Sequence, residues 1–193
     1  MSRYKQSIPA GYFDRRYAAD PDPWRFETSD YERAKYDATL AALPRARYAS
    51  GLEIACSIGV LTRRLAECCD TLLALDVAEA ALDRARARCH GLDHVGFLRG
   101  QVPGDWPEGS FDLILLSEVV YYLDKADVGR LAERVQGCLR PGGDVVLVHW
   151  TGETHYPLTG DEAALLFMKK AGSLSACAAT RTEAYRLEVL RSQ

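Results

Sequence analysis

Two acids and a glycine, Glu53, Gly59 and Asp76, have the spacing that points most directly to chemistry. Glu53 lies in the apolar segment 51–55, Gly59 follows that segment, and Asp76 ends a second apolar run. This pattern predicts a strand, a tight turn, a helix and a second strand that ends in an acid. Such units bind nucleotide-like cofactors, because the acid can accept hydrogen bonds from ribose hydroxyls. We therefore expect a cofactor site; the alternative is that both acids are strand-end residues facing water.

The elements that must position these residues alternate along the chain. The apolar patterns predict strands at 51–55, 71–76, 95–99, 111–117 and 144–150, with a closing hairpin at 174–179 and 184–190. Helices are expected from about residue 30 to 44 and at 61–69, 79–89, 125–139 and 161–171. Alternating strands and helices predict an α/β fold with a mainly parallel sheet, in which the hairpin adds one antiparallel strand.

Length and composition narrow the class of protein. The 193 residues fit one domain, in which we expect 1–47 to form an N-terminal lid and helix and 48–193 to form the core sheet. The net charge of −3 argues against a nucleic-acid partner. The six cysteines show no C-x-x-C pair, and no apolar run reaches transmembrane length. We expect free thiols and a cytoplasmic protein without a membrane partner.

Four motifs, in this order, make the chain resemble class I S-adenosylmethionine-dependent methyltransferases. They are Leu52-Glu-Ile-Ala-Cys-Ser-Ile-Gly59, Leu75-Asp-Val77, Phe111-Asp-Leu-Ile-Leu-Leu-Ser-Glu118 and Leu139-Arg-Pro-Gly-Gly143. The resemblance implies a Rossmann-like sheet of seven strands with helices on both faces and a reversed last strand. It also implies S-adenosyl-L-methionine as the cofactor and S-adenosyl-L-homocysteine as its product.

Within that family the chain resembles the nodulation N-methyltransferases, NodS. The additional matches are Glu118-Val-Val-Tyr-Tyr-Leu123, Pro23-Trp-Arg25 and Tyr31-Glu-Arg33. This resemblance implies that the methyl acceptor is the free amine of a deacetylated amino sugar or chito-oligosaccharide. It fades after Trp150, where we expect the substrate contacts.

The chain departs from the family pattern in its glycine loop. The usual E-x-G-x-G-x-G reads here as Glu53-Ile-Ala-Cys-Ser-Ile-Gly59, so that only the last glycine remains. The methyl group of Ala55 restricts positive φ and narrows the space beside the cofactor. Gln101 stands where the family often has Asp beside the adenine amine, and its side-chain carbonyl can still accept that hydrogen bond.

Carried over by position, the resemblance assigns the cofactor contacts. Glu53, Ala55 and Gly59 would line the methionine end, Asp76 and Val77 would hold the ribose, and Gln101 and Val102 would flank adenine. Ser117 would end its strand beside the sulfonium. Trp24 could close over the cofactor and Arg33 could pair with its carboxylate, although Trp24 could equally be core and Arg33 a surface charge.

Methyl transfer is an in-line displacement that gains most from positioning, and an ammonium acceptor must first lose a proton. Glu118 follows the strand 111–117 and is our first candidate for orienting the acceptor. Tyr121 and Tyr122 could shape the acceptor pocket, and His149 ends a strand at the same sheet edge. Further candidates lie in the next loop: His155 for a sugar contact, and Trp150 and Tyr156 for stacking. No metal is required, and the four histidines are not spaced as ligands.

Three other readings stay open. One is a small-molecule O- or carboxyl-methyltransferase. A second is an NAD-dependent oxidoreductase, which the absence of G-x-G-x-x-G and the closing hairpin disfavour. The third is a domain that binds the cofactor without catalysis, which the altered glycine loop would permit. The sequence leaves the oligomeric state open.

Overall fold

The computed structural model describes residues 3–193, and seven strands form one sheet in it. Their order is β3-β2-β1-β4-β5-β7-β6. The strands are β1 (Gly51–Ile54), β2 (Leu72–Asp76), β3 (Val95–Arg99), β4 (Phe111–Ser117), β5 (Leu139–Trp150), β6 (Leu174–Arg181) and β7 (Tyr185–Ser192). β7 runs antiparallel to β5 and β6, and the pairs among β1 to β5 are parallel. The predicted fold class is confirmed.

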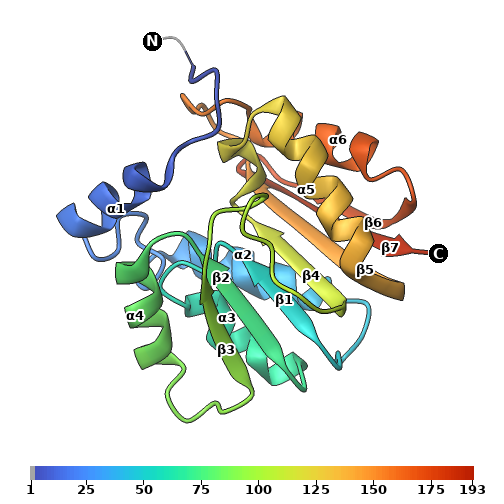
Figure 1. Cartoon of the computed structure of the whole chain (residues 1–193), viewed down its shortest axis with the longest axis horizontal. Helices are drawn as coiled ribbons and strands as arrows, with labels where there is room; N and C mark the ends of the chain where they lie inside the picture. The colour runs from blue at the N-terminus through green and yellow to red at the C-terminus, as the bar shows by residue number, and fades with distance from the viewer. Residues whose placement is uncertain (1–2) are drawn as a thin grey trace.

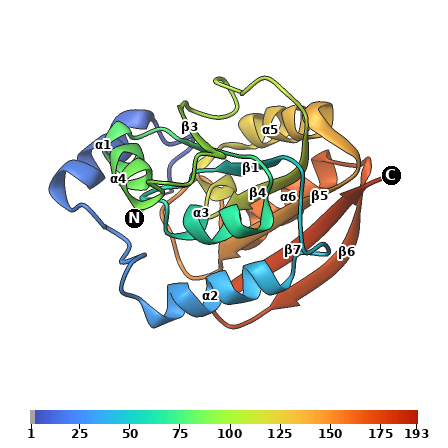
Figure 2. The same cartoon turned by 90° about the horizontal axis from the view of Figure 1, so that it is seen from below.

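Helices cover both faces of the sheet (Figures 1 and 2). They are α1 (Ala10–Ala19), α2 (Asp30–Ala41), α3 (Val60–Leu65), α4 (Glu79–Arg88), α5 (Lys125–Cys138) and α6 (Gly160–Lys170), with 3₁₀ turns η1 (Ala66–Cys68) and η2 (Val120–Tyr122). None of them, within residues 3–193, is long and apolar enough to cross a membrane.

The alternation of side chains along β4 explains the two layers. Ile114 and Leu116 pack in the cluster that holds α5 and α6, whereas Leu113 and Leu115 pack in the cluster that holds residues of α2 and α3. Successive strand residues point to opposite faces, so a continuous apolar run predicts a strand buried on both sides. All four residues are fully buried.

Three elements differ from the sequence-based expectation. α1 was not predicted, because its sequence mixes polar and aromatic residues and Tyr17 is its only buried residue. β5 begins at Leu139 rather than Asp144, since Pro141, Gly142 and Gly143 are accommodated by a register shift against β4. α2, which was expected to reach about residue 44, ends at Ala41, three residues before Pro44.

Strand order places the site. Connections from β1 lead outward through β2 to β3, and β4 then returns to the other side of β1. This reversal opens a crevice at the carboxyl ends of β1 and β4, which is where ligands bind in doubly wound sheets. α1 lies against α4 at this edge (Figure 1).

Candidate cofactor and acceptor site

A cavity of about 600 Å³ opens over the carboxyl ends of β1, β2 and β4. Its size is that of a pocket for a small molecule or cofactor. The predicted site residues that line it are Trp24, Glu53, Ala55, Asp76, Val77, Gln101, Val102, Ser117, Glu118, Tyr121 and Tyr122. His155, Trp150 and Tyr156 line it as well. One cavity therefore gathers most of the residues that the sequence pattern singled out.

The loop after β1 keeps the backbone of a glycine loop without its glycines. Ala55 has φ 62° and Ser57 has φ 52°, both in the left-handed region. The Ser57 N–H donates to Asp76 at 2.8 Å, and the Ser57 hydroxyl bonds the Tyr17 hydroxyl at 2.5 Å. These bonds hold the loop in a conformation that costs a residue with a Cβ about 1–2 kcal/mol.

We expect Ala55→Gly to raise the free energy of unfolding by about 1 kcal/mol, since the left-handed strain exceeds the added entropy of glycine. Urea unfolding measures this. Gly91→Ala is the matched control, because Gly91 has φ 84° and an added Cβ there would meet nothing within 4 Å. It should cost about what Ala55→Gly gains. An Ala55→Gly variant less stable than the parent would show that the loop is not strained.

Glu53 is a buried carboxyl with one oxygen that has no partner. It is 2% exposed, and its Oε2 has no hydrogen bond. Burial raises the pKa of Glu53 to about 8. An unpartnered buried carboxyl on a cavity wall fits a cationic group of a ligand, such as the ammonium of an amino acid.

Asp76 ties the end of β2 to the loop after β1. Its Oδ2 accepts the Ser57 N–H, and its Oδ1 accepts the Ala78 N–H at 2.9 Å. Burial raises the pKa of Asp76, and these N–H groups oppose that rise. Each oxygen keeps lone-pair capacity, which suits the two hydroxyls of a ribose.

The side-chain amide of Gln101 is held by a hydrogen bond to the N-terminal segment. Its Nε2 donates to the Ile8 carbonyl at 3.1 Å, which leaves Oε1 as a free acceptor on the cavity wall. Its backbone N–H donates to Asp105 at 2.9 Å. With Val102 beside it, this corner fits an aromatic base that carries an amino donor.

Glu118 lies where β4 ends and has φ 55°. Its Oε2 accepts the Tyr121 hydroxyl at 2.6 Å and the Trp150 N–H at 3.0 Å. Tyr121 and Tyr122 are buried and pack on Tyr156, with ring centroids 5.4 and 4.5 Å away. This half of the cavity is therefore an aromatic pocket with a hydrogen-bonded carboxylate.

Three predicted site residues lie elsewhere. Arg33 is exposed and pairs with Asp30 at 2.9 Å, because it points off α2 into solvent. Gly59 does not line the cavity; an added Cβ would come within 2.8 Å of Ala85, so this glycine makes room for α4.

His149, expected as a candidate catalytic residue, is fully buried outside the cavity lining. Its Nε2 lies 3.3 Å from the Val120 N–H and accepts that hydrogen bond, which supports η2. Burial lowers the pKa of His149 to about 4. The ring is therefore neutral and part of the framework of the site.

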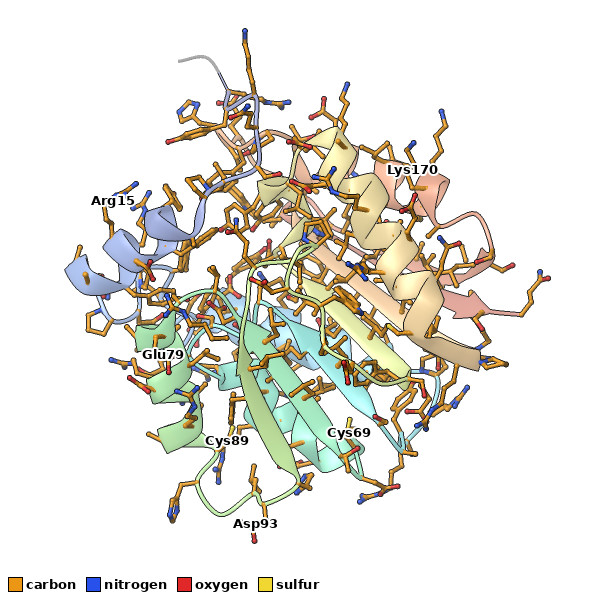
Figure 3. The ribbon with its side chains drawn as sticks, viewed as in Figure 1. Arg15, Cys69, Glu79, Cys89, Asp93 and Lys170 are labelled. Carbon is orange, nitrogen blue, oxygen red and sulfur yellow. The ribbon has the colours of Figure 1, made fainter. Side chains whose placement is uncertain are left out.

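Sequence reasoning missed the charges of α2 and the aromatic residues of α1. Glu32 and Lys35 line the cavity, although an i, i+3 pair of opposite charge is typical of a solvated helix face. On α1, Tyr12, Phe13 and Arg16 line the cavity, while Arg15 points away from the sheet (Figure 3). Only the density of tyrosines near the N-terminus could have signalled their role.

Comparison with known proteins settles the family. The model of Nodulation protein S (NodS) matches residues 11–149, from α1 to the penultimate residue of β5. The chain belongs to the NodS family. Nodulation protein S of Rhizobium tropici is 36% identical over 135 residues, which are 69% of this chain and 56% of that protein. The match to the protein of Bradyrhizobium diazoefficiens, also 36% identical, covers 57% of the chain and 53% of that protein. The chain thus matches little more than half the length of these NodS relatives.

Solved structures agree on the fold. A candidate methyltransferase from Pseudomonas syringae has 34% identity and a TM-score of 0.75, over 83% of this chain and 98% of its own. N-methyltransferase NodS from Bradyrhizobium japonicum, solved with S-adenosyl-L-homocysteine, has a TM-score of 0.85 over 96% and 99% of the two chains. At 24% identity the latter shows the shared fold alone. The NodS family match ends at His149, so the loop at 150–156, which lines the cavity, lies outside it.

Proposed function

We propose that this chain is an S-adenosylmethionine-dependent N-methyltransferase whose acceptor is the free amine of a deacetylated amino sugar or chito-oligosaccharide. The observation that carries the cofactor is Glu53, a buried carboxyl with an unpartnered oxygen on the same cavity wall as Asp76. The NodS relatives and the N-methyltransferase named among the similar structures support the reaction class.

The residues present fit the parts of the cofactor in sequence. Glu53 would bind the ammonium, Asp76 the ribose hydroxyls, and Gln101 Oε1 the adenine amine, with Val77 and Val102 as apolar contacts. When bound, S-adenosylmethionine supplies a methyl group on a positively charged sulfur. Ser117 and Glu118 lie between these contacts and the aromatic pocket of Tyr121 and Tyr156, which is where an acceptor would lie.

The aromatic pocket supports a sugar acceptor. Tyr121 and Tyr156 are stacked, and Trp150 is 38% exposed on the cavity wall. Flat aromatic faces pack on the apolar faces of sugar rings, and Glu118 offers an acceptor for an amine N–H. We infer that the loop at 150–156 contributes to acceptor choice.

Calorimetric titration with S-adenosyl-L-homocysteine, with NAD as the control, tests the cofactor. We expect micromolar affinity for the first ligand alone. Methyl transfer is then followed by mass spectrometry on fully deacetylated chitotetraose and on its acetylated form. One added methyl group on the deacetylated sugar alone is expected. Binding without transfer to any amine would leave a cofactor-binding domain, and transfer to hydroxyl acceptors alone would make the chain an O-methyltransferase.

A further inference from the structure

A buried lysine joins α2 to the loop after β4. The Lys35 side chain is 1% exposed, and its Nζ lies 2.5 Å from Glu118 Oε1 and 3.0 Å from Glu32 Oε1. The ring of Tyr31 lies 5.1 Å from the same nitrogen. All four side chains line the cavity. We call Glu32, Lys35 and Glu118 the charge cluster.

Glu118 has little freedom within this cluster. Lys35 occupies Oε1, and Tyr121 and Trp150 donate to Oε2. A carboxylate has about four lone-pair sites, so roughly one remains for a ligand. Partners on three other elements therefore fix the orientation of the Glu118 carboxylate. Because Glu118 lines the cavity, its remaining lone pair is available to a ligand there.

With both carboxyls ionised, the cluster carries one net negative charge. Burial raises the pKa of Glu32, and Lys35 opposes that rise. Burial alone would raise the pKa of Glu118. Lys35, the Trp150 N–H and the Tyr121 hydroxyl outweigh that effect, so the pKa of Glu118 lies below its ordinary value. Burial also acts to lower the pKa of Lys35, and the two carboxylates reverse that effect. Removing one partner of a buried ion pair leaves an uncompensated charge.

We propose that Lys35 is a positioning residue for methyl transfer, which holds Glu118 ionised and aimed so that its free lone pair accepts an N–H of the acceptor amine. This inference rests on the proposed function. The amine nitrogen forms the bond to the methyl carbon, the electron pair of the broken methyl–sulfur bond stays on sulfur, and the product ammonium loses its proton to water. Glu118 orients the amine and does not take the proton.

The titratable groups that face Glu118 come from α2, η2 and β5. They are Tyr31, Glu32, Lys35 and Tyr36 of α2, Tyr121 and Tyr122 of η2, and His149 of β5, with Arg186 of β7 near His149. Arg186 bonds Glu188 and Asp161. Lys35 is the cation bonded to Glu118 among the described residues.

The first test is the pH profile of methyl transfer to deacetylated chitotetraose. Without Lys35, burial raises the pKa of Glu118. Lys35→Met should lower kcat at pH 7 by about 30-fold or more, with the KM for S-adenosylmethionine little changed, and should add an acid limb to the profile. Lys35→Arg should restore the parent profile. Arg33→Met, which removes the exposed cation of the same helix, should leave rate and profile unchanged.

A double-mutant cycle separates positioning from structure. Lys35→Met with Glu118→Gln keeps the net charge of the cluster at −1, so this variant leaves one buried carboxylate, Glu32, without its cation, whereas Lys35→Met alone leaves two. If Lys35 acts through Glu118, its removal in the Glu118→Gln background costs less than about threefold in kcat/KM. An equal cost in both backgrounds, or a Lys35→Met enzyme with the parent pH profile, would overturn the proposal.

Urea unfolding between pH 5 and 8 tests the same relation without any acceptor. In Lys35→Met the raised pKa of Glu118 makes the folded state lose stability as pH rises through that pKa. Adding Glu118→Gln should reduce this loss. If the parent methylates no amine yet the unfolding data follow this pattern, the proposed function fails while the charge relation stands. The reverse outcome overturns the role of Lys35 alone.

Discussion

Replacing Asp76 by alanine should weaken S-adenosyl-L-homocysteine binding by about 100-fold or more. The carboxylate accepts two backbone N–H groups, from Ser57 and Ala78, while it also offers lone pairs to a ribose. A hydrogen bond to a charged group contributes about 1.5–3 kcal/mol, so losing the ribose contacts alone reaches that factor. The freed Ser57 N–H also releases the loop that Ala55 and Ser57 hold in left-handed conformations. Calorimetric titration measures the affinity.

Asp83→Ala is the control for that experiment. Asp83 is an exposed acid on α4, paired with Arg86 at 2.9 Å, and its removal should leave the affinity within about twofold. Asp76→Asn separates the two roles, because the amide keeps one acceptor oxygen for a backbone N–H but loses the charge. An Asp76→Ala protein that binds the ligand as tightly as the parent would rule out a cofactor at the end of β2.

The sheet could be predicted because its strands carry their own signal. Phe111–Ser117 was predicted with the bounds that the structure shows, since it is a nearly continuous apolar run, and the bounds of the shorter Val95–Arg99 were matched as well. α1 could not be predicted in the same way. Its support is tertiary: the Tyr17 hydroxyl bonds Ser57, and Phe13 packs edge-on to Tyr122 with ring centroids 4.9 Å apart.

The cofactor half of the site was within reach of the sequence for a similar reason. Glu53, Asp76 and Ser117 lie in or at the ends of parallel strands, and the topology brings such residues to one edge. Lys35 could not be predicted from the sequence. Its charge is buried because α2 packs at the sheet edge, and no local sequence pattern indicates this packing. The expectation that His149 faces the site was wrong for a geometric reason. Successive residues at the end of a strand point to opposite faces, and the His149 side chain lies against η2 instead of the cavity.

Ligand affinity should rise with pH between 6 and 7.5 because of Glu53. Its pKa of about 8 keeps the carboxyl mainly protonated in the free protein at these pH values. The ammonium of S-adenosyl-L-homocysteine favours the ionised form and lowers that pKa, so binding expels a proton. The window closes as pH passes the pKa of Glu53, because above about 8 the carboxyl is already ionised in the free protein. The dissociation constant should fall by about tenfold per pH unit at most.

Two controls isolate Glu53 in this linkage. 5′-Methylthioadenosine lacks the amino-acid end and should bind with no such pH dependence. Glu53→Gln should bind S-adenosyl-L-homocysteine more weakly at pH 7.5 and with a flat profile. Titration in buffers of different ionisation enthalpy counts the released proton directly. Proton release that persists in Glu53→Gln would assign it to another group.

The same carboxyl makes an opposite prediction for the free protein. A group whose folded-state pKa lies above its unfolded value stabilises the fold fully below the unfolded pKa, near 4.5, and this contribution is lost as pH rises through about 8. Glu53→Gln should therefore be more stable than the parent at pH 8, by about 2 kcal/mol or more, and little different at pH 4.5. As pH rises, Glu53 then lowers the free energy of unfolding of the ligand-free protein and raises its affinity for the ligand. This combination is expected of a buried carboxyl that binds a cationic ligand. Equal urea midpoints for the two proteins at pH 8 would show that Glu53 is not held in its protonated form.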